Sequence, residues 1–425
     1  SVMDVQPADR KLRIAFIYSR IPFPLMRGDQ LTVANLISFL SARGHSIDFY
    51  TLDCGGQMSP QQAAWLNQNC AQVRLYPQSR VANLWGIAAG VLKRLPAQVG
   101  YFSNRSLQRD VSRAIRSGEY DIVYTYYVRS AQAVPDIFTP NQSSIVSGRR
   151  CASFLAMQLS QFLNVGRMAA RETSFLRRQV YKLEQRLLGR YEGSIWQKFT
   201  KTCLIGSKDV QAVEEACRQS SNPPINNVVF SAHGTDVKRF RVPDDWEIVS
   251  GRIVFSGNMG YRPNIEAITW FFANCWDEIK RRVPGASLFI VGRDPGPEIC
   301  ELERHDGVHV TGTVEDVGEY IRSASVCINP MQAGGGMQNK LVEYLASGSV
   351  VVATAVANEG VNAPPDAIML ADSPQAFIDA VVHVLENPHQ AAEIRQNARR
   401  FAEECWTWES HFLKLESSFF DAITA

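Results

Sequence analysis

Short apolar runs alternate with amphipathic segments along most of the chain, which predicts parallel β-sheets covered by helices on both faces. Residues 13–18 read Arg-Ile-Ala-Phe-Ile-Tyr, the length of one buried strand. A Pro/Gly loop, a helical pattern at 31–43 and a stop at Gly44 follow, and a second strand is predicted at 47–51. This succession of strand, loop, helix, glycine and strand is typical of a βαβ unit.

The same arrangement begins again at residue 252. Residues 252–256 predict a strand, a glycine loop follows, and a helix over 264–282 leads to a strand at 286–292. The other predicted strands lie at 121–126, 202–205, 227–231, 308–311, 326–329, 350–353 and 367–370. The sequence therefore predicts two Rossmann-like α/β domains.

The length of 425 residues agrees with two domains, because single cores stop growing at roughly 250–300 residues. We place the boundary near 206–209, with one domain over 1–206 and the other over 207–402. The amphipathic segment 403–425 is expected to pack back on the first domain.

Composition excludes several classes of protein. A hydrophobic fraction of 45% is ordinary for a globular chain, and a net charge of +2 gives no reason to expect nucleic acid as a partner. The nine cysteines are odd in number and form no C-x-x-C pair, which favours free thiols in a reducing cytoplasm. No apolar run reaches the length of a transmembrane helix, and the first residues do not resemble a secretory signal.

Loops that directly follow strands of the second half are candidate binding sites, because parallel sheets expose backbone N–H groups there. The first loop is 256–261, in which glycines let a diphosphate approach the backbone. Its candidate contacts are Gly257, Asn258 and Arg262. An ordinary βα turn explains this loop alone equally well.

The second loop carries three consecutive glycines before a helix on which Lys340 and Glu343 share one face. A lysine near a helix N-terminus suits phosphate, and a carboxylate one turn deeper suits ribose hydroxyls. Without the glycines a surface Lys–Glu pair would be the better interpretation, and the glycines reverse that preference. In the third loop, 311–316, the backbone at Val314 is placed to meet a base edge, although a helix N-cap explains the loop as well.

The ordered set of motifs resembles the large family of retaining GT-B glycosyltransferases with an E-x7-E motif. Within it the chain is most similar to bacterial enzymes of exopolysaccharide and surface-glycan assembly. The resemblance covers most of 11–415 and is strongest over 228–360. The motifs that carry it are Ala-His-Gly-Thr-Asp at 232–236 with Phe240, then 255–264, 290–293, 310–314 and 334–348. It implies two Rossmann-like domains whose sheets face each other across a cleft, the first binding the acceptor and the second the nucleotide-sugar.

The resemblance also implies roles for single residues. Glu343 would bind the ribose and Lys340 the diphosphate, both at the catalytic centre, and Gly28 would belong to an N-terminal loop near the phosphates. The other donor-site candidates are Gly335, Gly336, Gln338 and Asn339. The chain departs from the pattern at Gly335, where the first glutamate of the motif is missing, and at His233, which replaces an asparagine.

Sugar transfer leaves negative charge on the departing diphosphate, and glycine N–H groups, Lys340 and a helix N-terminus can stabilise it without a metal. We therefore expect a transfer with neither metal nor cofactor, the nucleotide-sugar being a substrate, and the resemblance implies that the transfer retains configuration. The N-terminal half is expected to bind the glycan or lipid-linked acceptor. There Asp29 would orient a loop or a substrate hydroxyl. Four arginines are candidates for an anionic acceptor, although each alone is also explained as a solvated surface residue: Arg20, Arg27, Arg105 and Arg129.

Two segments suggest contact with an anionic membrane surface. Residues 161–202 hold nine basic and three acidic residues with apolar residues interleaved at helical spacing, and residues 81–92 are apolar and precede Lys93 and Arg94. Core helices with one solvated face are an equally good interpretation. The expected location is the cytoplasm, at or near the inner face of the cell membrane.

Two other functions remain open. A sugar-nucleotide 2-epimerase would use the same scaffold, with His233 as the one suggestively placed histidine. A non-catalytic sugar-nucleotide-binding subunit of a glycan synthase would explain the carboxylate missing at Gly335. A nicotinamide dehydrogenase is disfavoured, because neither Rossmann start shows G-x-G-x-x-G with an acidic residue at the end of the next strand.

Overall fold

The chain folds as two compact units, each built on its own sheet. The structure is a computed structural model that describes residues 6–23, 25, 28–56, 58–231, 234–333 and 339–425. Unit 1 comprises 1–232 and 412–425, and unit 2 comprises 233–411. The predicted α/β class with two Rossmann-like sheets is confirmed.

The sheet of unit 1 has the strand order β3-β2-β1-β4-β6-β7-β8, and β5 pairs with β6. Every pairing is parallel except that of β5 with β6. The strands are β1 Arg13–Tyr18, β2 Ser46–Asp53, β3 Gln72–Pro77, β4 Ile122–Tyr126, β5 Ser144–Val146, β6 Arg149–Gln158, β7 Lys201–Leu204 and β8 Val228–Phe230. The predicted strand at 13–18 coincides with β1, which lies next to the point where the strand order reverses.

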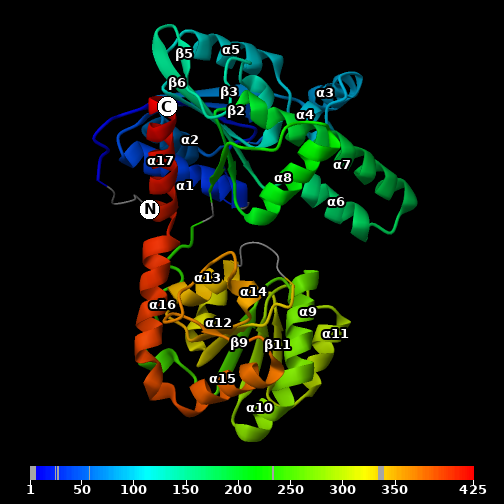
Figure 1. Cartoon of the computed structure of the whole chain (residues 1–425), viewed down its shortest axis with the longest axis vertical. Coiled ribbons are helices and arrows are strands. Elements are labelled where there is room, and N and C mark those ends of the chain that lie inside the picture. Colours follow the sequence, from blue (N-terminus) through cyan, green and yellow to red (C-terminus); the bar gives the residue numbers. More distant parts are fainter. Residues whose placement is uncertain (1–5, 24, 26–27, 57, 232–233, 334–338) are drawn as a thin grey trace. The chain divides into compact units, whose positions relative to one another are not determined.

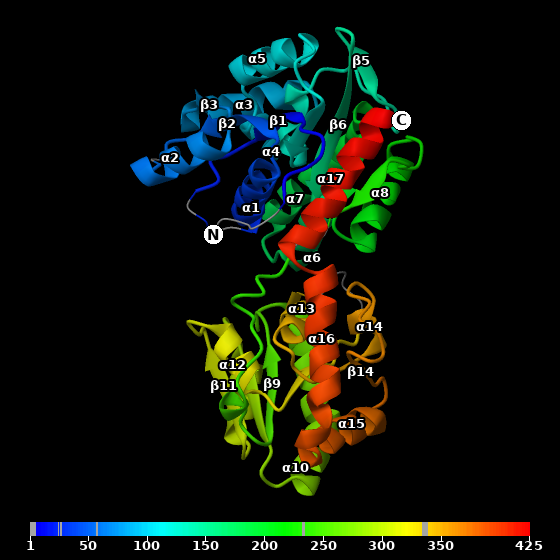
Figure 2. The same cartoon turned by 90° about the vertical axis from the view of Figure 1, so that its left-hand side faces the viewer.

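Helices cover both faces of this sheet (Figures 1 and 2). They are α1 Gly28–Ala42, α2 Pro60–Asn69, α3 Arg80–Leu92, α4 Ala97–Tyr101, α5 Arg105–Arg116, α6 Gln161–Arg171, α7 Phe175–Ile195, α8 Ser207–Gln219 and α17 Trp408–Thr424. Short 3-10 turns lie at Val128–Ala133 and Trp196–Lys198. One face packs against α5, α7 and α8, and the aromatic residues of the other face pack against α17.

Unit 1 extends past residue 206, where we expected the boundary. The reason is that β8 pairs with β7 in the same sheet, with Thr202 opposite Val228, so α8 is the crossover between two strands of unit 1. Three strands of this sheet were not predicted: β3, the three-residue β5 and β6. The edge strand β3 is largely exposed, and β6 begins with two arginines, so neither has the simple apolar pattern of a buried strand.

The sheet of unit 2 is entirely parallel, in the doubly wound order β11-β10-β9-β12-β13-β14. Its strands are β9 Arg252–Ser256, β10 Ser287–Val291, β11 Val308–Gly312, β12 Val326–Asn329, β13 Val351–Ala353 and β14 Met369–Leu370. All six were predicted within two residues at either end, because each is a short run with apolar residues that is bounded by turn residues.

Helices flank this second sheet as well (Figure 1). They are α9 Arg262–Phe271, α10 Asp277–Arg282, α11 Pro297–Cys300, α12 Val317–Ser323, α13 Asn339–Ala346, α14 Ala355–Asn358, α15 Pro374–Glu386 and α16 Ala392–Cys405. A π-turn at Phe272–Trp276 joins α9 to α10, and 3-10 turns lie at Asp245–Glu247, Glu301–Arg304 and Pro388–Ala391. The strands and helices share one apolar core.

The C-terminal helix α17 is held in unit 1 by a buried carboxylate. Glu416 accepts hydrogen bonds from Arg43 at 2.9 and 2.6 Å. The ring of His45 accepts a hydrogen bond from the backbone N–H of Leu12 at Nδ1, so its Nε2 carries the proton and donates to Glu416 at 2.8 Å. Burial alone would raise the pKa of Glu416, but these hydrogen bonds outweigh it, and the pKa lies below the ordinary 4.5. The last helix of the chain is thereby tied to the loop before β2.

Replacing Glu416 by Gln is expected to destabilise unit 1 by about 2–4 kcal/mol at neutral pH, because Arg43 would lose its ionic partner. The folded pKa of Glu416 is depressed, so this stabilisation is present above pH 4.5 and is lost as the pH falls through the folded pKa. Urea denaturation at several pH values measures both effects. Asp421→Asn, an exposed carboxylate of the same helix, is the control. A loss equal in the two variants, or independent of pH, would contradict this account.

Candidate functional site in unit 2

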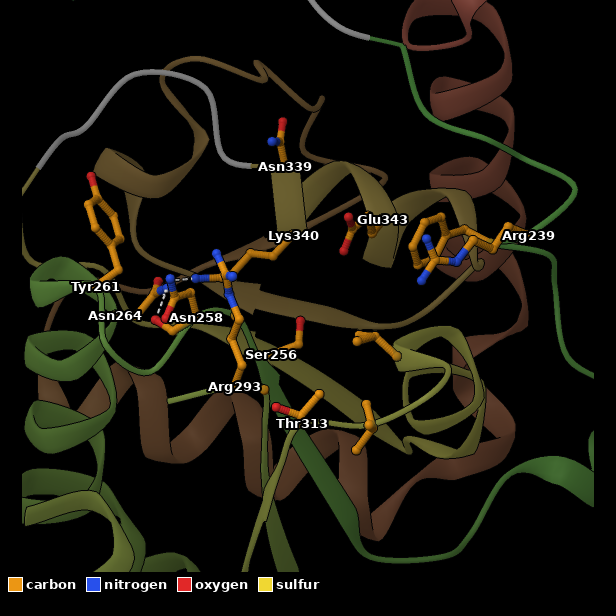
Figure 3. Close-up of a pocket in the computed structure, with 15 residues that line it drawn as sticks. Arg239, Ser256, Asn258, Tyr261, Asn264, Arg293, Thr313, Asn339, Lys340 and Glu343 are labelled. Carbon is orange, nitrogen blue, oxygen red and sulfur yellow. Dashed lines mark hydrogen bonds between the residues drawn. The ribbon is translucent and has the colours of Figure 1, made fainter. Parts of the chain in front are cut away.

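A pocket of about 490 Å³ opens at the carboxyl end of the unit 2 sheet, a size typical of small-molecule sites (Figure 3). It is built by the loops after β9, β10 and β11, by the start of α13 and by the turn before unit 2's first strand. The residues that line it are Arg239, Phe240, Ser256, Gly257, Asn258, Tyr261, Asn264, Gly292, Arg293, Thr313, Val314, Val317, Asn339, Lys340 and Glu343.

The floor of the pocket depends on two glycines at the ends of adjacent strands. The φ angles of Gly257 and Gly292 are +147° and +146°, a region that L side chains rarely adopt. A Cβ on Gly292 would lie 1.7 Å from the carbonyl oxygen of Gly257, and a Cβ on Gly257 would lie 2.7 Å from Nδ2 of Asn264. Neither position can therefore carry a side chain without moving the loop.

Asn264 links the first loop to the lysine of α13. Its Nδ2 donates to the carbonyl of Asn258 at 3.0 Å, and its Oδ1 accepts from the ammonium of Lys340. The ammonium also lies 4.6 Å from the centre of the Phe255 ring. Burial lowers the pKa of Lys340 to about 7. The hydrogen bond to Asn264 thus fixes the orientation of the Lys340 side chain. The surrounding protein stabilises its positive charge only partly.

Glu343 lies on the same helix face, on the opposite side of the pocket from Asn264 (Figure 3). Burial raises its pKa to about 7, and the cations of Arg239 and Lys340 counteract that rise. Within the described part of the chain no residue forms a hydrogen bond or ion pair with this carboxylate. A half-buried carboxylate without donors favours a ligand that brings hydroxyl or N–H groups of its own.

The charged groups of the pocket favour an anion overall. Arg239, Arg293 and Lys340 face it, against the single carboxylate of Glu343. The first residues of α13, an eight-residue helix, also line the pocket, so the positive end of the helix dipole adds to the field. Cations around a pocket that a helix N-terminus also borders are suited to phosphate groups.

Contacts from the rest of unit 2 fix α13 in place. The hydroxyl of Tyr344 accepts a hydrogen bond from the backbone N–H of Ser256 at 2.8 Å, which binds the helix to the end of β9. Arg399 of α16 donates to the carbonyls of Phe240 and Ala346, at 2.8 and 2.7 Å. The turn that carries Arg239 and the helix that carries Glu343 are therefore held by one guanidinium.

Six of the predicted donor-site residues line this pocket: Gly257, Asn258, Val314, Asn339, Lys340 and Glu343. Arg262 does not, because its exposed guanidinium pairs with Glu266 one turn further along α9, at 3.0 Å. Gly28 is the first residue of α1 in unit 1. Gly335, Gly336 and Gln338 lie outside the described residues, as does His233.

Sequence reasoning did not select several residues of the pocket, chiefly Arg239, Asn264 and Arg293. Arg293 follows β10, so the rule that ligands bind after parallel strands could have found it. Arg239 and Asn264 gave no such signal, because their roles arise from contacts between segments distant in the chain. In the third loop Asp316 is the N-cap of α12, and Val314 lines the pocket, so its contact with a base edge stays a prediction.

A second polar cluster lies in unit 1, at the carboxyl ends of β1 and β4. Asp29 accepts a hydrogen bond from the hydroxyl of Tyr18 at 2.5 Å and lies 3.7 Å from the guanidinium of Arg20. Burial, together with the charge of Arg20, lowers the pKa of Arg129 to about 10. Arg105 is exposed at the start of α5.

The guanidinium of Arg129 lies 4.5 Å from the ring centre of Phe102 and 4.9 Å from that of Tyr127. It has no hydrogen bond or ion pair with any residue that the structure describes. It lines a small cavity together with Ser19 and Ser130, and the buried hydroxyls of both serines also lack partners there. The cavity itself measures only about 10 Å³, which is room for about one water molecule.

No cluster of three or more His, Cys, Asp or Glu side chains that could hold a metal ion occurs among the described residues. The expected independence of metals and cofactors stays a prediction.

The chain was compared with known protein families, curated proteins and solved structures. Residues 250–387, which include most of the pocket, match the family model described as glycosyl transferases group 1. The chain is 20% identical over 402 residues to an uncharacterized 44.6 kDa protein in the cps region of Klebsiella pneumoniae, covering 92% of this chain and 96% of that protein.

Solved structures match over nearly the whole length. HepE from Anabaena, in complex with UDP and glucose, has a TM-score of 0.56 at 13% identity and covers 96% of this chain and 99% of its own. WaaG, a glycosyltransferase involved in lipopolysaccharide biosynthesis, has a TM-score of 0.51 at 16% identity, with the same coverage. Residues 250–387 thus match a group 1 glycosyltransferase domain, and the chain as a whole has the GT-B fold of these glycosyltransferase structures.

Proposed function

We propose that the protein transfers a sugar from a nucleotide-sugar, bound in the unit 2 pocket, to a glycan, a lipid-linked saccharide or another surface-polysaccharide acceptor. The observation that carries this proposal is the pairing of Lys340, held by Asn264, with Glu343, which lacks any described hydrogen-bond donor. The cations would bind the diphosphate, and the carboxylate would accept hydrogen bonds from ribose hydroxyls. Support comes from HepE, whose structure contains UDP and glucose, and from WaaG, which acts in lipopolysaccharide biosynthesis.

The same geometry supports a mechanism without a metal. As the bond between the anomeric carbon and the diphosphate breaks, the negative charge on the leaving group grows. Lys340, Arg293 and the first turn of α13, which line the pocket, would stabilise that charge. Retention of configuration belongs to this proposal and rests on the sequence resemblance.

The donor pocket is tested by thermal stabilisation with nucleoside diphosphates and their sugars. We expect one nucleotide class to raise the melting temperature of the wild type. Glu343→Gln should weaken its binding about 10- to 100-fold, because hydrogen bonds to a charged group contribute about 1.5–3 kcal/mol. The matched control is Glu359→Gln, an exposed carboxylate outside the pocket. If no nucleotide stabilises the wild type, or if the control loses as much affinity, the assignment of the pocket is wrong.

The affinity for a nucleotide should fall both above and below neutral pH. In the free protein the ammonium of Lys340 is lost above pH 7, so binding of a diphosphate weakens about tenfold per pH unit there. Below pH 7 Glu343 becomes protonated and loses its capacity to accept two hydroxyls. Titration calorimetry should therefore show the tightest binding near pH 7. Lys340→Met should abolish the alkaline decline and Glu343→Gln the acidic one; profiles unchanged by both variants would refute these roles.

On the acceptor side, we propose that Arg129 binds an anionic group such as the phosphate of a lipid-linked saccharide. Arg129→Gln should raise KM for a phosphate-bearing acceptor about tenfold or more and leave the KM for the nucleotide-sugar unchanged. Arg105→Gln, which removes an exposed arginine, should change neither constant by more than a small factor. Because Arg129 has no described ionic partner, its loss should not lower the melting temperature. A lower melting temperature without a change in KM would assign Arg129 a purely structural role.

A further inference from the structure

One side of unit 1 exposes large apolar side chains on two helices. On α3 the exposed fractions are 63% for Val81, 63% for Leu84, 72% for Trp85, 63% for Val91 and 88% for Leu92. On α7 they are 68% for Phe175, 75% for Leu176, 63% for Val180 and 58% for Leu183. We call these nine side chains the α3/α7 surface. Their exposure shows that α3 and the first half of α7 present apolar side chains to solvent, whereas α6 and the second half of α7 contribute residues to the core, as the alternative interpretation expected.

The packing of α3 explains why its apolar residues point outward. The helix contacts α4 through glycines, and a Cβ on Gly86 would lie 2.2 Å from the carbonyl oxygen of Gly100. The small side of α3 is therefore buried, and the large side chains remain outside. On α7 the spacing of Leu176, Val180 and Leu183 places them in one stripe along the helix.

The two helices belong to one side of unit 1, where Figure 1 shows α3, α4, α6 and α7 gathered together. The carboxylate of Glu184 on α7 accepts hydrogen bonds from the backbone N–H groups of Ala97 and Gln98 at the start of α4, at 2.8 and 3.3 Å. Since α4 packs against α3, this contact fixes α3 relative to α7.

The charges around the α3/α7 surface all have the same sign. Its exposed cations are Arg80, Lys93, Arg94, Arg177, Lys182 and Arg186. The chain has no acidic residue from 80 to 104. The three acidic residues of α6 and α7 and of the turn between them all bond to backbone N–H groups: Glu172, Glu184 and Glu192. No described residue forms an ion pair with the six cations.

We propose that the α3/α7 surface docks the protein on an anionic lipid membrane. Exposed tryptophan, phenylalanine and leucine side chains enter the acyl boundary of a bilayer, while lysine and arginine contact anionic headgroups. A second copy of the chain fits less well, because a two-fold interface would bring these cations against one another. None of the helices in the described residues is long and apolar enough to cross a membrane, so the contact is peripheral.

This membrane contact is independent of the proposed sugar transfer, because vesicle binding is measured without substrates. The full-length protein should co-sediment with phosphatidylcholine vesicles that contain phosphatidylglycerol, and less with phosphatidylcholine alone or at high salt. The double variant Trp85→Glu/Leu176→Glu should weaken binding more than about tenfold. Each change replaces a large apolar side chain that would enter the bilayer by a charged one. Lys93→Gln/Arg94→Gln should weaken binding to anionic vesicles only.

Trp246→Glu is the matched control, because Trp246 is 81% exposed but belongs to unit 2. It should bind vesicles as the wild type does, and all variants should keep the wild-type melting temperature, since the changed side chains are exposed. Absence of binding to anionic vesicles would overturn the proposal, as would an equal loss in Trp246→Glu. The surface would instead be an interface with a second copy of the chain if the wild type forms a dimer, the double variant is monomeric and neither protein binds vesicles.

Discussion

The close approach of Gly257 and Gly292 is the constraint on which the unit 2 pocket depends. Each glycine ends a parallel strand, and each has a φ angle near +147°, which lets the two backbones lie in contact. The backbone N–H of Gly257 donates to the carbonyl of Val291 at 2.9 Å, and that of Met259 donates to the carbonyl of Arg293 at 2.8 Å. The loop after β9 is thereby fixed to the loop after β10, and Asn264 can reach both Asn258 and Lys340.

The charged side chains inside the two units fall into two groups, those with hydrogen-bond or ionic partners and those without. Glu416 and Glu192 are surrounded by donors: Arg43 and His45 for the first, and Ser160 with two backbone N–H groups for the second. Such groups hold helices in place. Glu343 in unit 2 and Arg129 in unit 1 lie in cavities without described ionic partners.

Leaving a buried charge without partners costs stability, so this pattern is informative. A structural role would have supplied partners, as it does for Glu416. Burial brings the pKa of Glu343 and that of Lys340 both to about 7, which makes the free pocket sensitive to the binding of a charged ligand. Groups without partners therefore mark the residues that we propose bind ligands, and groups with full sets of partners mark structural ones.

The sequence by itself determined that the chain forms two α/β sheets, all six strands of the unit 2 sheet and the loops after those strands that border the pocket. Local pattern is sufficient for these features, because a buried parallel strand must be a short apolar run and a glycine loop must follow it where a ligand meets the backbone. Lys340 and Glu343 were predicted to share one face because three-residue spacing on a helix guarantees it. The edge strand β3 escaped prediction, since an exposed strand lacks that apolar pattern.

Only the tertiary structure decided which polar residues meet and which apolar helices remain exposed. Asn264 reaches Lys340 across 76 positions of the chain, and Arg262, only two residues earlier, pairs instead with Glu266. The exposure of Trp85 and Leu176 likewise depends on the glycines by which α3 packs on α4 and on the contact of Glu184 with α4. Contacts between distant segments follow from how the elements pack, and one-dimensional patterns of hydrophobicity carry no record of that packing.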